Sequence, residues 1–248
     1  MHTIELQGNG PPLLVLHGWG QSHEALTPLA ELLTPAAKPY LVDLPGFGQS
    51  KIPENVWSAY DYADCMVRYL DMQQIDKFSV LGHSFGGKIA MCLAMRYPER
   101  VEKLVLVAAS GVPPQRSLIR RLKMKSIVSA GKLLKSYDRI FGTQHFQQKY
   151  APKFGSRDYK NAGNMRPILV KSVNEDLAPV LSQVKCKTLI LWGENDPETP
   201  LESGKRLANL IPESTFCSFP YHDHQLFQDA GAHLCARYIT PFLQEKKQ

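Results

Sequence analysis

The chain has few cysteines and no paired cysteine motif. The 248 residues include five widely spaced cysteines, an odd number, at Cys65, Cys92, Cys186, Cys217 and Cys235. No Cys-x-x-Cys pair occurs, so neither a disulfide framework nor a cysteine-based zinc site is expected. We predict that all five are buried as small apolar side chains.

The sequence also lacks long apolar runs, linkers and repeats. No run approaches the roughly 20 apolar residues of a membrane helix, and residues 1–7 do not have the charged-then-apolar layout of a signal peptide. No Gly/Ser/Pro-rich linker, internal repeat or low-complexity stretch divides the chain. We therefore expect a cytoplasmic protein with one large core that is interrupted by an insertion.

Short apolar runs alternate with helical patterns along most of the chain. The runs at 13–16, 78–81, 104–108 and 188–192 are typical of strands that are buried on both faces. Such alternation predicts an α/β fold with a mainly parallel sheet and helices on both faces. Between 112 and 180 the spacing is helical without a convincing strand. We predict a core of residues 1–111 and 181–248, with residues 112–180 inserted as a helical cap, or lid, over the strand C-termini.

Positive charge is concentrated in this insertion. The whole chain has a formal net charge of +6, but residues 112–175 hold 14 Lys and Arg against 3 Asp and Glu. The rest of the chain is therefore mildly acidic. A basic face favours an anionic partner, although a solvated helical surface explains the same pattern equally well. No nucleic-acid-binding motif is present, and we do not expect nucleic acid as the partner.

The segment Gly82-His83-Ser84-Phe85-Gly86 lies between the apolar run 78–81 and a helical pattern. A Gly-x-Ser-x-Gly sequence in that position predicts a nucleophile elbow, a tight turn that exposes the Ser84 hydroxyl at a helix N-terminus. The helix N-terminus favours the negative charge that develops in acyl transfer. Ser84 is therefore the predicted nucleophile of a serine hydrolase.

A serine nucleophile needs a base and an acid, and both follow in the expected chain order. Asp196 comes just after the predicted strand 188–192, and His224 comes just after the predicted strand 215–219. We predict His224 as the general base and Asp196 as the residue that orients it. Glu194 competes with Asp196, and His222 competes with His224. A metal cluster of His222, Asp223 and His224 with His233 is not expected, because no further patterned ligands are present.

The oxyanion formed in acyl transfer needs backbone N–H donors. One is predicted at Phe85, directly after the nucleophile. The second is predicted at Trp19, in the turn His17-Gly18-Trp19-Gly20 after the run 13–16. His17 and His83 are interpreted as structural residues, and Asp43 as a turn former. No metal and no cofactor are expected for this chemistry.

Five ordered pieces of the sequence resemble the α/β-hydrolase fold family. They are His17-Gly18-Trp19-Gly20, the stretch from Asp43 to Ser50, Gly82 to Gly87, Gly193 to Asp196, and His224. Within that family the turns resemble the pimeloyl-[acyl-carrier protein] methyl ester esterases and related small carboxylesterases. This resemblance implies Trp19 and Phe85 as the oxyanion hole and a basic lid that binds an acidic acyl carrier protein. This chain departs from the esterase pattern at two positions. His83 stands where those esterases have Trp, and Asp223 stands where a Gly usually precedes the catalytic histidine.

The expected function is that of a serine carboxylesterase that hydrolyses a small-molecule ester through an acyl-serine intermediate. An acyl-carrier-protein methyl ester is one candidate substrate. The same motifs occur in perhydrolases related to non-haem haloperoxidases, in C–C bond hydrolases and in lactonases. Some proteins of this fold are ligand receptors with little turnover, which is the alternative of another class. Haloalkane dehalogenases and epoxide hydrolases are disfavoured because they need an aspartate where Ser84 stands.

Overall fold

The computed structural model describes residues 1–114, 118–150 and 157–245, and of residues 118–125, 147 and 157 it describes the backbone alone. The chain divides into two compact units. One consists of Met1–Pro114 together with Lys171–Gln248, and the other of Gln115–Val170. None of the helices in the described residues is both long and apolar enough to cross a bilayer.

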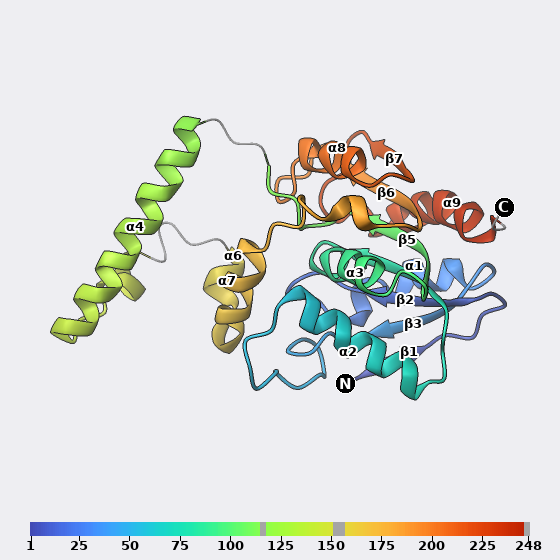
Figure 1. The fold of residues 1–248 in the computed structure, drawn as a ribbon, viewed down its shortest axis with the longest axis horizontal. Helices are drawn as coiled ribbons and strands as arrows, with labels where there is room; N and C mark the ends of the chain where they lie inside the picture. The colour runs from blue at the N-terminus through green and yellow to red at the C-terminus, as the bar shows by residue number, and fades with distance from the viewer. Residues whose placement is uncertain (115–117, 151–156, 246–248) are drawn as a thin grey trace. The chain divides into compact units, whose positions relative to one another are not determined.

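The first unit is built on a sheet whose seven strands, counted over the described residues, have the order β1-β3-β2-β4-β5-β6-β7 (Figure 1). All neighbouring pairs there run parallel except β1 with β3. The order reverses at β2, because β3 lies on one side of it and β4 on the other. The strands are β1 (Thr3–Glu5), β2 (Pro12–Leu16), β3 (Lys38–Val42), β4 (Phe78–His83), β5 (Val101–Val107), β6 (Lys187–Gly193) and β7 (Ser214–Phe219).

Helices cover both faces of this sheet, as the alternation of apolar runs predicts. Side chains of β2, β4, β5 and β6 alternate between the faces. Leu13, Leu81 and Val105 belong to the core that α1 (Thr27–Leu33) and α9 (Ala230–Gln244) cover. The opposite face packs against α3 (Phe85–Arg96) and α8 (Leu201–Leu210), and α2 (Ala59–Met72) packs on α3. Short 3-10 turns η1 (His23–Ala25) and η4 (Leu181–Gln183) complete the unit.

The second unit is helical. Its elements are α4 (Leu118–Phe141), the π-helical turn η2 (Phe146–Tyr150), α6 (Arg157–Asn161) and the 3-10 turn η3 (Gly163–Met165), and α7 (Arg166–Asn174) leads from it into the first unit. Asp138 fixes the turn after α4 by accepting hydrogen bonds from Thr143 Oγ1 at 2.5 Å, Phe146 N at 2.7 Å and His145 N at 3.0 Å. The predicted core and lid boundaries, at 111/112 and 180/181, remain predictions.

The cysteines differ partly from expectation. Cys92 and Cys235 are buried as predicted, but Cys65, Cys186 and Cys217 are only half-buried. Cys217 is on β7, the last strand of the sheet in the described part of the chain, so a neighbouring strand covers only one side of it there. The prediction that all five are core residues is therefore wrong for these three.

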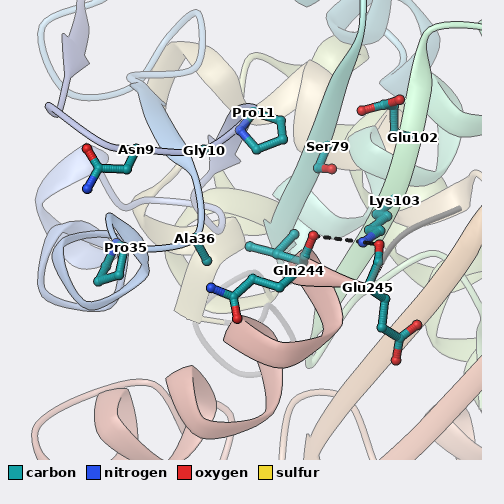
Figure 2. A pocket seen from close by; sticks show the side chains of 11 residues that line it. Asn9, Gly10, Pro11, Pro35, Ala36, Ser79, Glu102, Lys103, Gln244 and Glu245 are labelled. Carbon is teal, nitrogen blue, oxygen red and sulfur yellow. Dashed lines mark hydrogen bonds between the residues drawn. The ribbon is translucent and has the colours of Figure 1, made fainter.

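Lys103 is a buried cation at the N-terminal end of the strands. Its ammonium donates to the carbonyl oxygens of Phe242, Leu243 and Glu245, at 2.8, 2.7 and 2.5 Å, and so caps the C-terminal end of α9. Figure 2 shows this cap beside a cavity of about 430 Å³ that Pro11 and Ser79 also line. Ser84, Asp196 and His224 do not line this cavity.

Candidate active site

Ser84 stands between β4 and α3, where the strand becomes a helix without an intervening loop. Its backbone has φ 50° and ψ −110°, a conformation that strains a residue with a side chain. The turn is also too tight for side chains at two glycines. A Cβ on Gly86 would collide with the main-chain oxygens of Leu16 and His17, and one on Gly82 with the main chain of Gly86. The Gly-x-Ser-x-Gly pattern is therefore required by this turn.

Hydrogen bonds hold Ser84 in its strained conformation. Its N–H donates to the Val107 carbonyl at 3.1 Å. Its carbonyl accepts from Lys88 N at 3.1 Å, Ser110 N at 3.0 Å and Ser110 Oγ at 3.1 Å. The residue itself is half-buried.

Asp196 follows β6 and is buried, with 5% of its surface exposed. One carboxylate oxygen accepts the backbone N–H groups of Glu198 and Thr199, both at 2.8 Å. The other accepts the Thr199 hydroxyl at 2.7 Å. Burial raises the pKa of Asp196, but the hydrogen bonds from His224 and Thr199 outweigh it and hold that pKa below its usual value. The carboxylate is therefore charged and oriented at neutral pH.

His224 follows β7 and is also buried, with 5% of its surface exposed. Its Nδ1 lies 2.8 Å from Asp196 Oδ2 and 3.2 Å from Thr199 Oγ1. An N–H at Nδ1 that donates to a carboxylate leaves Nε2 as the basic nitrogen of the neutral ring. The structure thus brings together the histidine and the aspartate that the sequence analysis preferred.

The two competing residues point elsewhere. Glu194 accepts a hydrogen bond from Ser218 Oγ at 2.8 Å on the exposed side of β7. The His222 ring packs against Phe219, with ring centroids 6.2 Å apart. The main chain of His222 binds Asn195 N at 2.9 Å, so this residue helps to hold the loop that contains His224.

Glu198 occupies the outer side of the His224 ring. Its Oε2 lies 3.3 Å from His224 Nε2. Among the described residues, Ser84 Oγ makes no hydrogen bond to that ring. The Glu198 side chain is 61% exposed, so a rotation into solvent would release Nε2.

His83 ties the His224 loop to the elbow. It is buried, its Nε2–H donates to the carbonyl of His224 at 3.0 Å, and the two rings are 4.8 Å apart. Its Nδ1 lies 3.2 Å from Gln21 Oε1, which also accepts Gly18 N at 2.9 Å. Burial and the neighbouring His224 lower the pKa of His83 to about 3, so the ring is neutral and does not act as an acid or base near pH 7.

His17 holds the loop after β2 in place. Its Nδ1 donates to the Gly18 carbonyl at 2.7 Å, and its Nε2 accepts Leu44 N at 3.0 Å. Burial lowers the pKa of His17 to about 4, which keeps the ring in the neutral form that this arrangement requires. The loop before Trp19 is therefore joined to the turn that begins at Asp43.

Trp19 and Phe85, the predicted oxyanion-hole residues, lie in one aromatic cluster. Their ring centroids are 5.3 Å apart, and Phe47 packs on Trp19 at 4.8 Å. Tyr62 contacts Phe85 at 5.2 Å. Phe85 is buried and Trp19 is half-buried. The segments after β2 and after Ser84 are thus packed together at the C-terminal ends of β2 and β4, where the strand order reverses and such sheets bind ligands.

Three contacts of the site were missed by sequence reasoning. Only the contact of Thr199 could have been predicted from the sequence. Asp196 is followed by Pro and then by two residues with backbone N–H groups, and this pattern is typical of an Asx-turn. Gln21 and Glu198 have no such signal, since their contacts depend on how separate loops meet.

A family model described as "alpha/beta hydrolase fold" matches residues 11–126. The chain is 28% identical over 244 residues to a poly(3-hydroxyalkanoate) depolymerase of Ectopseudomonas oleovorans, covering 96% of this chain and 86% of the relative. It is 28% identical over 241 residues to a pimeloyl-[acyl-carrier protein] methyl ester esterase of Chromobacterium violaceum, covering 90% and 91%. The structure matches a meta-cleavage product hydrolase of Pseudomonas fluorescens with a TM-score of 0.71 and 24% identity, over 97% and 92% of the two chains. These findings confirm the predicted fold class and the resemblance to the methyl ester esterases.

Proposed function

We propose that this chain, which has the α/β-hydrolase fold, is a serine carboxylic ester hydrolase. Ser84 is the proposed nucleophile, His224 the general base and acid, and Asp196 the residue that orients His224. The backbone N–H groups of Trp19 and Phe85 are the proposed oxyanion hole. The observation that supports this assignment most strongly is the buried His224–Asp196 pair at 2.8 Å, at the same sheet edge as a strained, half-buried serine.

The reaction has two halves. Ser84 Oγ attacks the ester carbonyl while His224 Nε2 takes its proton, and the oxyanion accepts hydrogen bonds from the two backbone N–H groups. The protonated His224 gives its proton to the leaving alcohol, which leaves an acyl group on Ser84. Water, deprotonated by His224, then releases the carboxylic acid and restores the serine. Glu198 has to leave Nε2 before the first step, because the Ser84 hydroxyl needs that position.

Hydrolysis of short p-nitrophenyl esters tests this function. Ser84→Ala should lose turnover by at least about 10⁴-fold, since no other group forms the acyl intermediate. Ser218→Ala is the matched control, because its hydroxyl binds Glu194 on the far side of β7. Near-wild-type hydrolysis by Ser84→Ala would reject the proposal.

We further propose, from the resemblance to the methyl ester esterases, that an acidic acyl carrier protein presents the ester and that the basic insertion binds it. The cations with described side chains include Lys132, Lys135 and Arg139, which are exposed along one stripe of α4. The insertion also contains Arg120, Arg121, Lys123 and Lys125, whose side chains are outside the described part of the structure.

A charge reversal tests this partner. The double variant Lys132→Glu/Arg139→Glu should raise KM for a pimeloyl-carrier-protein methyl ester by at least about tenfold and weaken its salt dependence. It should leave p-nitrophenyl ester hydrolysis unchanged. Lys205→Glu, on α8 of the other unit, is the control. Equal KM values for the double variant and the control would refute the carrier-protein proposal and leave the esterase proposal standing.

A further inference from the structure

Three side chains outside the candidate active site form a group that we infer to be a divalent transition-metal site. They are His2, His23 and Asp43, and their ligand atoms all lie within 4.8 Å of one another. They come from three separate segments, namely the residues just before β1, the turn η1 and the end of β3. Two imidazoles and a carboxylate are ligands that Zn²⁺ prefers, whereas Mg²⁺ and Ca²⁺ prefer oxygen alone.

One residue of this group, His2, has an unpartnered ring nitrogen. Of the buried side-chain nitrogen and oxygen atoms in the described residues, only His2 Nε2 and Ser203 Oγ have no hydrogen-bond partner. Leaving a buried polar atom unsatisfied costs about 1–3 kcal/mol, so such an atom indicates an unseen water or ion. Coordination of a cation would satisfy His2 Nε2 directly.

The surroundings orient the three ligands before any metal binds. His2 N donates to Ser50 Oγ at 2.8 Å, and the His2 carbonyl accepts Asp43 N at 3.0 Å. The His2 and His23 rings are 5.1 Å apart. Asp43 Oδ2 accepts Gln49 N at 2.9 Å, and this hydrogen bond fixes the plane of a carboxylate that is fully buried.

The remaining carboxylate oxygen would be the ligand. Asp43 Oδ1 lies 2.8 Å from His23 Nδ1 and 2.7 Å from His23 N. Tetrahedral Zn²⁺ separates two ligand atoms by roughly 3.3 Å. The Asp43–His23 pair would therefore open by about half an ångström, and the other pairs, which are at most 4.8 Å apart, would close by at most about 1.5 Å. In binding, Zn²⁺ takes the place of the Nδ1 proton between His23 and Asp43, and the neutral His23 ring then carries its one N–H proton on Nε2 instead.

Zn²⁺ at this position would link the start of the edge strand β1 to two loops of the site region. The loop of His23 follows Trp19, and the turn that begins at Asp43 contains Phe47, which packs on Trp19. The expected effect is therefore stabilisation of these loops. The proposed role of this Zn²⁺ is structural rather than catalytic. Its binding can therefore be measured independently of the proposed esterase activity.

Calorimetric titration of the EDTA-treated full chain with ZnCl₂ tests the site. We expect one Zn²⁺ per chain and a rise in Tm of roughly 5–10 °C at a free concentration of about 100 times Kd. MgCl₂ should have no effect. His2→Asn should abolish both signals, because Asn has no atom at the Nε2 position. His233→Asn, which removes an exposed histidine from α9, should retain them.

Substitution of Co²⁺ for Zn²⁺ gives a second readout, a visible d–d absorption that reports coordination and is independent of folding stability. It should appear in the wild type and in His233→Asn and be absent from His2→Asn. Equal Zn²⁺ binding by wild type and His2→Asn, or no binding by a folded wild type, would overturn the inference. In the latter case a buried water is the partner of Nε2.

Discussion

Acidification from about pH 7.5 to about pH 5 should destabilise the folded chain by about 4 kcal/mol, through two buried histidines. His17 and His83 are each 1% exposed, and burial lowers their pKa values to about 4 and about 3 from an ordinary 6.5. Both rings stay neutral when folded and take up a proton when the chain unfolds. Below pH 6.5 the unfolded state therefore binds more protons, and the free energy of unfolding falls as the pH falls.

The magnitude follows from the linkage relation. Each such ring loses about 1.4 kcal/mol per pH unit below its unfolded pKa. Over roughly 1.5 units this amounts to about 2 kcal/mol for each histidine and about 4 kcal/mol for both. Asp196, whose pKa lies below its usual value, is ionised in both states over this range and contributes nothing to the slope.

Urea unfolding at several pH values, followed by circular dichroism, measures this dependence. His83→Gln retains a donor toward the His224 carbonyl but cannot titrate, so it should reduce the pH-dependent loss by about half. His233→Gln removes an exposed histidine and should leave the slope as in the wild type. A free energy of unfolding that stays constant down to about pH 5 would refute the account of His17 and His83 as buried neutral rings.

Three substitutions test other parts of the site. Asp196→Asn should lower kcat by roughly 10⁴-fold in a p-nitrophenyl ester assay, because an amide does not hold His224 in the required tautomer; a loss below tenfold would contradict its role. Glu198→Gln removes a carboxylate 3.3 Å from His224 Nε2, so hydrolysis of anionic esters should rise several-fold relative to neutral esters; an unchanged ratio would exclude that influence. Gly86→Ala places a methyl group against the main chain of Leu16 and His17 and should destabilise the fold by roughly 1–3 kcal/mol; a wild-type urea midpoint would show that the elbow tolerates a Cβ.

Local patterns predict the strands and the elbow well, because both depend on short segments. The buried strands are continuous apolar runs, and Ser84 needs glycines at fixed offsets. Helical spacing also predicts one helix over residues 22–33, and this prediction is less accurate. In the structure η1 covers His23–Ala25 and α1 begins at Thr27, because His23 N–H is bound by Asp43 from a distant loop at 2.7 Å. A tertiary contact of this kind leaves no trace in the helical spacing.

The last helix shows the same limit. Helical spacing predicts a last helix from about Gln225 to Leu243, whereas α9 begins at Ala230. Asp229 has φ 50°, and a Cβ on Gly231 would meet the carbonyl of Leu226, so the chain turns here before the helix begins. His224 is preferred over His222 because the catalytic histidine of this fold lies in the loop just before a helix. Its contacts come from two other segments, namely the loop that contains Glu198 and Thr199, and the strand β4, which contains His83. Spacing alone predicts the order of such residues along the chain but not which ring nitrogen meets which carboxylate.

Reaction of the chain with a fluorophosphonate probe, followed by peptide mass spectrometry, tests the central claim most directly. A phosphonyl group on the peptide that contains Ser84, at one per chain, is the predicted result, and Asp196→Asn should slow its formation strongly. Labelling that is absent from the folded wild type, or that persists at the same rate in Ser84→Ala, would contradict the assignment of Ser84 as the activated nucleophile.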